Sequence, residues 1–162
     1  MKILIINICN EKLHKLEFVK PIEDILNENK IKFKTKHYKN LIKKDLLTDK
    51  IIICGTSLRD NNFLKNIKEF LWIKNYKKPL FGICGGSHII GLISNHKLKN
   101  KKQIGLKEIK INKFLGIQGK KQVYHLHNFQ VLPETFNQEN FYATLFHPEV
   151  RNKEIIVNFC NL

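Results

Sequence analysis

The stretch Gly82-Ile83-Cys84-Gly85-Gly86 constrains the fold more than any other part of the chain. An apolar run, Pro79-Leu80-Phe81, precedes it, and a run with helical spacing follows over residues 87–93. A cysteine flanked by glycines between a strand and a helix is typical of a nucleophile elbow, a sharp turn in which only small neighbours fit. The elbow lifts the Cys84 side chain clear of the sheet. It also places the sulfur at a helix N-terminus, which favours the thiolate.

A second motif, Phe146-His147-Pro148-Glu149, contains the partners that a nucleophilic cysteine needs. A thiol requires a histidine as base, and the histidine requires a carboxylate that orients it. We therefore predict that Cys84 is a nucleophile, His147 its general acid/base and Glu149 the orienting group, although 63 residues separate Cys84 from His147. The alternatives are a small buried core cysteine and an ordinary loop histidine.

Composition indicates one globular domain over residues 1–162, with 43% hydrophobic residues and no apolar run of the ~20 residues that a membrane span requires. The apolar N-terminus is typical of a first buried strand rather than a signal peptide. The four cysteines form no CxxC pair, which argues against a zinc site or a disulfide framework. We expect a cytoplasmic protein with no metal and no cofactor.

The net charge of +15 raises the question of a nucleic-acid partner. Of the 29 basic residues, only Arg59 and Arg151 are arginines, and the lysines are spread over most of the chain. This distribution indicates a general lysine bias and disfavours nucleic-acid binding. The dense stretches 97–102 and 107–113 are interpreted as solvated faces or a docking surface.

The order of apolar segments predicts an α/β fold. Strands are expected at 2–8, 32–38, 50–54 and 79–83, with helices after the first, third and fourth, which implies a parallel sheet with right-handed crossovers. Pro21 is expected in a first helical turn, and Asp60 or Asn61 as the cap of a helix that buries Phe63, Ile67, Phe70 and Leu71. The pattern of apolar residues in the second half of the chain predicts strands at 104–111, 114–118, 122–131 and 141–146 and a closing helix at 153–160.

A thiolate that attacks a carbonyl needs an oxyanion hole. The backbone N–H of Gly85 is one candidate donor, and the Gly55-Thr56 turn after the third strand supplies a second, unless it is an ordinary turn. His125 and His127 share one face of a strand, but a metal would need further ligands, so we expect no metal site there.

Taken together, these motifs resemble the class I, triad-type glutamine amidotransferases over nearly the whole chain. The stretches that carry the resemblance are residues 2–8, 51–55, 79–86, 123–127 with 131–133, 145–150 and 158–159. The resemblance implies a flavodoxin-like, open, mostly parallel sheet flanked by helices, with antiparallel strands added in the second half. It also implies that Cys84 attacks the side-chain amide of glutamine, forming a thioester, and that ammonia passes to a synthetase partner.

By the same resemblance, Gly55 and Gly85 supply the oxyanion donors, and His125, Leu126 and His127 line the glutamine site. The chain departs from the family where a glutamine usually stands four residues after the nucleophile, a position that His88 occupies here. The oxyanion loop is also reduced to residues 55–58. Two other functions therefore stay open: a hydrolase of γ-glutamyl or other small amides on the same fold, and a non-catalytic regulatory module.

Overall fold

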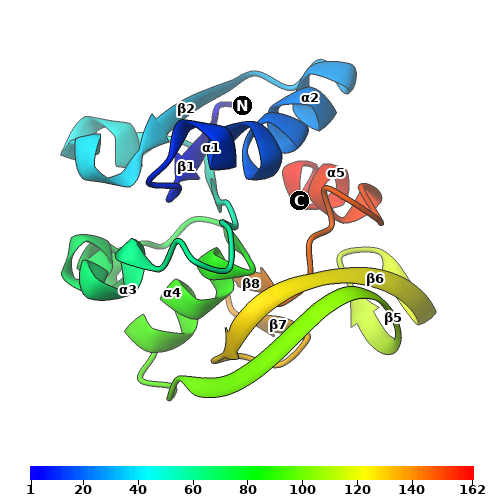
Figure 1. The fold of residues 1–162 in the computed structure, drawn as a ribbon. Coiled ribbons are helices and arrows are strands. Elements are labelled where there is room, and N and C mark those ends of the chain that lie inside the picture. The colour runs from blue at the N-terminus through cyan, green and yellow to red at the C-terminus, as the bar shows by residue number, and fades with distance from the viewer.

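A computed structural model describes residues 1–162, which form a six-stranded sheet and a separate two-stranded ribbon. The strands of the sheet follow the order β2-β1-β3-β4-β8-β7, and all neighbouring pairs are parallel except β7 and β8 (Figure 1). Their bounds are β1 Ile3–Asn7, β2 Phe33–His37, β3 Lys50–Ile53, β4 Leu80–Ile83, β7 Thr135–Gln138 and β8 Phe141–Thr144. The predicted mostly parallel sheet with an antiparallel addition is therefore confirmed.

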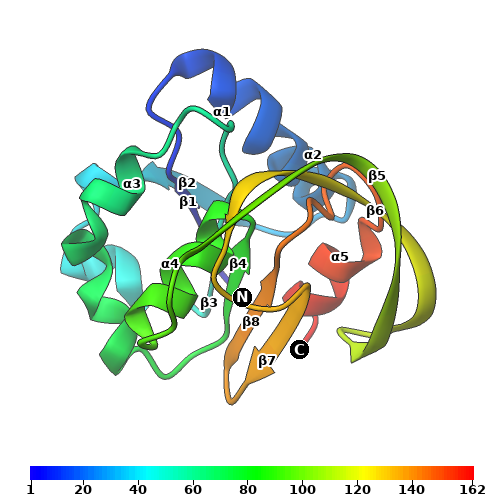
Figure 2. The same ribbon diagram turned by 60° about the horizontal axis from the view of Figure 1, so that its bottom comes forward.

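The helices cover both faces of this sheet, with α2 and α5 on one face and α3 and α4 on the other (Figure 2). Their bounds are α1 Lys12–Phe18, α2 Lys20–Glu28, α3 Asn62–Lys65, α4 Gly85–Ile93 and α5 Glu154–Cys160, with 3₁₀ turns η1 Tyr38–Asn40, η2 Lys43–Leu47 and η3 Ile67–Asn75. Because both faces are covered, the central strands are continuous apolar runs without alternation. No helix has the length and apolar character that crossing a membrane requires.

Two helix predictions need correction in detail. The expected first helix is split at Val19, and Pro21 lies in the first turn of α2, as predicted. The helix expected after the third strand is a single α-turn that continues as η3, so Phe63 and Phe70 are buried whereas Leu71 is exposed. Asn61 precedes α3 but forms no capping hydrogen bond, and its side-chain NH₂ donates to the Leu58 carbonyl.

The long ribbon consists of β5 Lys99–Phe114 and β6 Ile117–Gln130, which pair antiparallel and curve past β8 and α5 (Figure 1). The prediction of a strand at 114–118 was wrong. Leu115 and Gly116 both have positive φ angles, 43° and 79°, and connect Phe114 to Ile117 as a two-residue hairpin turn. The apolar residues around this turn resemble a strand in sequence, and Gly116 makes the reversal possible.

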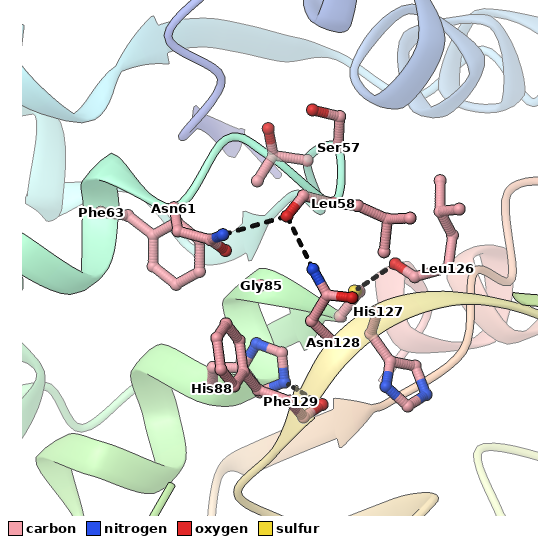
Figure 3. A pocket seen from close by; sticks show the side chains of 12 residues that line it. Ser57, Leu58, Asn61, Phe63, Gly85, His88, Leu126, His127, Asn128 and Phe129 are labelled. Carbon is pink, nitrogen blue, oxygen red and sulfur yellow. Dashed lines mark hydrogen bonds between the residues drawn. The ribbon is translucent and has the colours of Figure 1, made fainter. Parts of the chain in front are cut away.

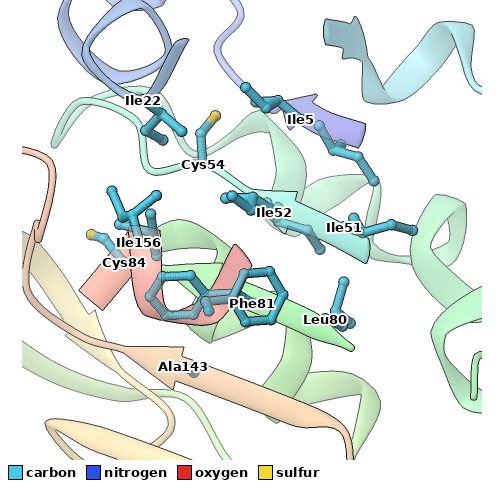
Figure 4. Packing of buried hydrophobic residues seen from close by; sticks show 14 of the residues in the cluster. Ile5, Ile22, Ile51, Ile52, Cys54, Leu80, Phe81, Cys84, Ala143 and Ile156 are labelled. Carbon is cyan, nitrogen blue, oxygen red and sulfur yellow. The ribbon is translucent and has the colours of Figure 1, made fainter. Parts of the chain in front are cut away.

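The core lies between the sheet, the helices and the inner side of the ribbon (Figure 4). Cys54 sits there beside Ile52 and Ile22, fully buried, and burial raises the pKa of its thiol well above the ordinary value. The prediction that Cys54 is a core residue is confirmed.

Candidate active site

Three strand ends meet at one edge of the sheet and bring the predicted residues together. β3, β4 and β8 are neighbours and run parallel, so their carboxyl ends lie side by side. Gly55 follows β3, Cys84 follows β4 and His147 follows β8. A Cβ built on Gly55 would lie 2.6 Å from Cε1 of His147 and 3.4 Å from Cβ of Cys84. Gly55 therefore fits between the cysteine and the histidine because it has no side chain.

The elbow at Cys84 has the strained geometry that its sequence predicts. Cys84 has φ 49° and ψ −98°, a conformation that L-residues rarely adopt, and its N–H donates to the Thr144 carbonyl over 2.8 Å. A Cβ on Gly82 would lie 2.5 Å from the Gly86 carbonyl carbon, and one on Gly86 would lie 2.4 Å from the Ile53 oxygen. The glycines thus let α4 approach the sheet closely and hold the cysteine at the N-terminus of that helix.

His147 and Glu149 form a fully buried pair. Nδ1 of His147 lies 2.7 Å from Oε1 of Glu149, and neither side chain is exposed. Because the carboxylate can only accept, Nδ1 carries the proton and Nε2 is left as the reactive nitrogen. Nε2 is buried and has no hydrogen-bond partner, while the ring packs against Phe18 with centroids 5.4 Å apart.

The surroundings of His147 favour the imidazolium. Burial by itself lowers the pKa of His147, but the neighbouring Glu149, which has the largest opposing effect, and Cys84 outweigh burial and raise the pKa well above its usual value. A histidine that keeps its proton can act as a general acid towards a leaving group. In this structure the Cys84 sulfur lies 3.5 Å from the Leu126 carbonyl, to which the thiol donates.

Two backbone N–H groups are available as oxyanion donors. Gly85 is the first residue of α4, so its N–H has no acceptor within the helix, and the N–H of Gly55 donates to no other backbone or side-chain group. The loop that carries Gly55 is fixed by Asp60, one of the two residues predicted to cap the helix after β3. Asp60 is buried and accepts from the Asn10 N–H over 2.6 Å and from the Thr56 hydroxyl over 3.0 Å.

A small cavity of about 20 Å³ lies beside Cys84. Residues 56–58 and 126–129, together with Asn61, Phe63 and the start of α4, form its wall (Figure 3). His88 belongs to this wall, and its Nε2 lies 2.9 Å from the Phe129 carbonyl. The side-chain amides of Asn61 and Asn128, neither of which was predicted as a site residue, both donate to the Leu58 carbonyl over 3.0 Å.

The histidines of β6 are placed differently from the expectation. His127 and Leu126 line the cavity, but His125 does not. Nδ1 of His125 lies 3.1 Å from Nε2 of His127, and Nδ1 of His127 lies 2.9 Å from the Lys101 carbonyl. Burial lowers the pKa of each histidine to about 4. Both rings are therefore neutral. His127 links β6 to β5 through the Lys101 carbonyl, and His125 is turned towards His127, so His125 offers no group to the cavity.

Comparisons with known proteins agree with this geometry. The family model described as "Glutamine amidotransferase class-I" matches residues 15–157. A relative from Pelagibacter ubique, described as imidazole glycerol phosphate synthase subunit HisH, is 30% identical over 147 aligned residues, which cover 63% of this chain and 70% of the relative. A relative with the same description from Methanocaldococcus jannaschii is 29% identical over 163 aligned residues, which cover 72% and 82% of the two chains.

Solved structures share the fold. A Thermoplasma acidophilum protein described as part of a GMP synthase has a TM-score of 0.82 and 17% identity, covering 99% of this chain and 92% of that one. A Thermotoga maritima glutamine amidotransferase has a TM-score of 0.63 and 17% identity, covering 95% and 78%. With a family model that spans nearly its whole length, this chain belongs to the class-I glutamine amidotransferase family.

Proposed function

We propose that residues 1–162 form a single-domain glutamine amidotransferase subunit that hydrolyses the side-chain amide of glutamine through Cys84. The observation that supports this function best is the meeting of Cys84, the His147–Glu149 pair and the N–H groups of Gly55 and Gly85 at one edge of the sheet. Acyl transfer through a thiolate needs all of these groups together.

In the proposed reaction, the Cys84 thiolate attacks the amide carbon, and the developing oxyanion accepts hydrogen bonds from Gly55 and Gly85. His147 gives its proton to the amide nitrogen, which leaves as ammonia, and a glutamyl thioester remains. A water molecule then attacks the thioester while His147 accepts its proton. Glutamate leaves, and the thiolate and the imidazolium form again. No cofactor takes part in these steps.

We further propose that the ammonia is delivered to a synthase or synthetase partner. The two relatives are described as subunits of imidazole glycerol phosphate synthase, and this chain spans 70% and 82% of their lengths. A protein that only releases ammonia needs a second protein that consumes it. This chain's own acceptor reaction is left open.

The decisive experiment combines glutamate release with labelling by a diazoketone analogue of glutamine, followed by peptide mapping. We expect one adduct, at Cys84, and loss of both activity and labelling in Cys84→Ser. Cys54→Ala is the matched control, and it should lower stability through the cavity it leaves while the active site stays intact.

The mapping must separate Cys84 from Cys9, because hydrogen bonding with Cys54 lowers the pKa of the buried Cys9 thiol. An adduct at Cys9, or full activity of Cys84→Ser, would contradict the proposal. Turnover of γ-glutamyl compounds without turnover of glutamine would instead support the hydrolase alternative, for which His88 in place of glutamine is the motivating feature.

A further inference from the structure

Two cysteines outside the catalytic group, Cys9 and Cys54, come together behind the Gly55 loop. Cys54 directly follows β3 (Figure 4), and Cys9 lies two residues after the end of β1, the strand that pairs with β3. The Cys54 sulfur lies 3.4 Å from the backbone nitrogen of Ile8, and the Cys9 sulfur lies 3.6 Å from the Gly55 carbonyl. Each sulfur thus contacts the residue next to the other cysteine, so the two thiols face each other.

The backbone on both sides of this pair is anchored. The Cys9 N–H donates to the side-chain oxygen of Asn7 over 2.8 Å, and Nε2 of His37 lies 3.1 Å from the Cys9 carbonyl. The Cys54 N–H donates to the Ile6 carbonyl, which extends the pairing of β3 with β1 by one residue. The two sulfur atoms therefore approach each other from segments that are fixed by hydrogen bonds.

The two thiols differ in burial and in acidity. Cys54 is fully buried, and burial raises the pKa of its thiol well above the ordinary value. Cys9 is 3% exposed and precedes the exposed Asn10, and hydrogen bonding with Cys54 lowers the pKa of the Cys9 thiol. The thiolate is the form that reacts with oxidants. A small oxidant that enters from the solvent therefore meets Cys9 first, with the second thiol directly beside it.

From these contacts we infer that Cys9 and Cys54 form a reversible disulfide in the presence of a peroxide, and that this bond displaces the N–H of Gly55 from its position as oxyanion donor. Transient disulfides of this kind are compatible with a compartment that otherwise keeps thiols reduced. Formation of the bond is independent of the amidase reaction, whereas its effect on turnover rests on the proposed function.

One molecule of hydrogen peroxide is consumed for each disulfide. The Cys9 sulfur attacks a peroxide oxygen, the O–O bond breaks, and the departing hydroxide takes the thiol proton and becomes water, which leaves Cys9 as a sulfenic acid. The Cys54 sulfur then attacks the Cys9 sulfur, the S–O bond breaks, and the Cys54 proton leaves with the hydroxyl group as a second water. The two thiols together lose two electrons and two protons, and the peroxide is reduced to two waters.

The bond affects the oxyanion donor because Cys54 and Gly55 share a peptide unit. Drawing the Cys54 sulfur towards Cys9 moves this peptide, which carries the Gly55 N–H. The thiol proton that Cys9 donates to the Gly55 carbonyl is lost as well. Gly55 has little room to move, since a Cβ there would lie 2.6 Å from Cε1 of His147. Loss of one oxyanion donor lowers the rate about 10²- to 10³-fold, which sets the expected size of the effect.

The first experiment tests whether the disulfide forms. It uses the Cys84→Ala protein, in which oxidation of the nucleophile cannot interfere. The protein is treated with hydrogen peroxide, the remaining thiols are alkylated, and the peptides are mapped without reduction. We expect one cross-link, between the peptides of Cys9 and Cys54, which dithiothreitol removes. No cross-link, a link to Cys160, or a link between two molecules would overturn the inference.

The second experiment measures glutamate release by the unaltered protein after peroxide. Arsenite returns a sulfenic acid at Cys84 to the thiol but leaves disulfides intact, whereas dithiothreitol reduces both. We expect kcat to stay about 10²- to 10³-fold low after arsenite and to recover with dithiothreitol. Cys9→Ala and Cys54→Ala each remove one half of the pair, and they should recover as far with arsenite as with dithiothreitol. Cys160→Ala keeps the pair and should behave like the unaltered protein.

Recovery of the unaltered protein with arsenite, despite a mapped cross-link, would overturn the effect on Gly55. A loss in Cys9→Ala that only dithiothreitol reverses would do the same, and Cys54→Ala gives the equivalent comparison if Cys9→Ala does not fold. Absence of glutamate release from the fully reduced protein would contradict the amidase function. The peptide map of the Cys84→Ala protein would still decide whether Cys9 and Cys54 form the bond.

Discussion

Glu149 is the residue on which the protonation of His147 depends. Its carboxylate lies 2.7 Å from Nδ1 in a fully buried setting and is the leading influence that raises the pKa of His147 against burial. Glu149→Gln keeps the shape and the hydrogen-bond acceptor but removes the charge. We expect glutamate release to fall about 10²- to 10⁴-fold, the usual share of general acid–base catalysis. The exposed Glu154→Gln is the matched control, and equal loss in both variants would contradict this role.

The His147–Glu149 pair also makes the free energy of unfolding depend on pH above neutrality. Because the pKa of His147 is raised in the folded protein, the stabilisation from its charge is fully present below about pH 6.5, the value of an unfolded histidine, and is lost as pH rises through the folded value. Urea unfolding should therefore show a fall in the free energy of unfolding above neutral pH that Glu149→Gln lacks. Parallel curves for the two proteins would exclude a raised pKa.

The sequence identified the residues whose motifs are local and missed those that act through tertiary contacts. The elbow at residues 82–86 and the motif at residues 146–149 could be predicted because each consists of residues that are neighbours in the sequence. An elbow, for example, needs flanking glycines. Asp60 holds the Gly55 loop only because Asn10 and Thr56 fold against it. Likewise, Asn61 and Asn128 are 67 positions apart and meet at Leu58, which no local pattern indicates.

At the scale of elements, α5 depends on a lysine from the centre of the sheet. Lys50, at the start of β3, is buried, and its Nζ donates to the carbonyls of Phe159, Cys160 and Leu162 over 2.6–3.2 Å. Its charge also suits the negative end of this short helix. Lys50→Met should lower the free energy of unfolding by about 1–3 kcal/mol, measured by urea denaturation. Lys110→Met, an exposed position on β5, should change it little, and an equal effect would contradict the capping role.

The neutral histidines around β6 predict acid sensitivity. His88, His125 and His127 are buried with pKa values lowered to about 4, so the unfolded chain binds protons between about pH 6.5 and 4 that the folded chain does not. Stability should fall as the pH is lowered through this range, by about 1.4 kcal/mol per pH unit for each histidine. His125→Gln should reduce the slope of the unfolding free energy by about that amount. An unchanged slope would show that His125 is already protonated in the folded protein.

The element patterns also show where sequence periodicity stops being informative. The buried isoleucine run of β3 can only be a central strand in a covered sheet, and it was predicted. The hairpin turn at Leu115-Gly116 is as apolar as its flanks, so periodicity extended a strand through it. The edge strand β7, Thr135–Gln138, was missed because its side chains are half-buried or exposed and mostly polar, and only pairing with β8 makes it a strand.

At the scale of the whole molecule, the cavity is held nearly closed by contacts between parts that are distant in the sequence. Asn128 on β6 donates to Leu58 in the loop after β3, and the Cys84 thiol donates to Leu126 on the same strand. With a volume of about 20 Å³, the cavity is far smaller than the ~300–1,000 Å³ typical of ligand sites. Substrate entry therefore requires β6 and the Gly55 loop to separate, and that opening costs free energy in every cycle of the free protein.

This arrangement predicts slow glutaminase activity alone and strong stimulation by a cognate synthase. A partner that binds the long ribbon would favour movement of β6 away from Leu58 and would align the Gly55 N–H. The Cys84 thiol would then interact with His147 instead of donating to the Leu126 carbonyl. Loss of one oxyanion donor costs about 10²–10³ in rate, so a misaligned Gly55 alone would account for a low basal rate. The measurement is glutamate release with and without the partner. Stimulation should appear mainly in kcat, because the partner completes the transition-state contacts. Fast release by the isolated chain, unchanged on adding the partner, would show that the closed cavity is no barrier to catalysis.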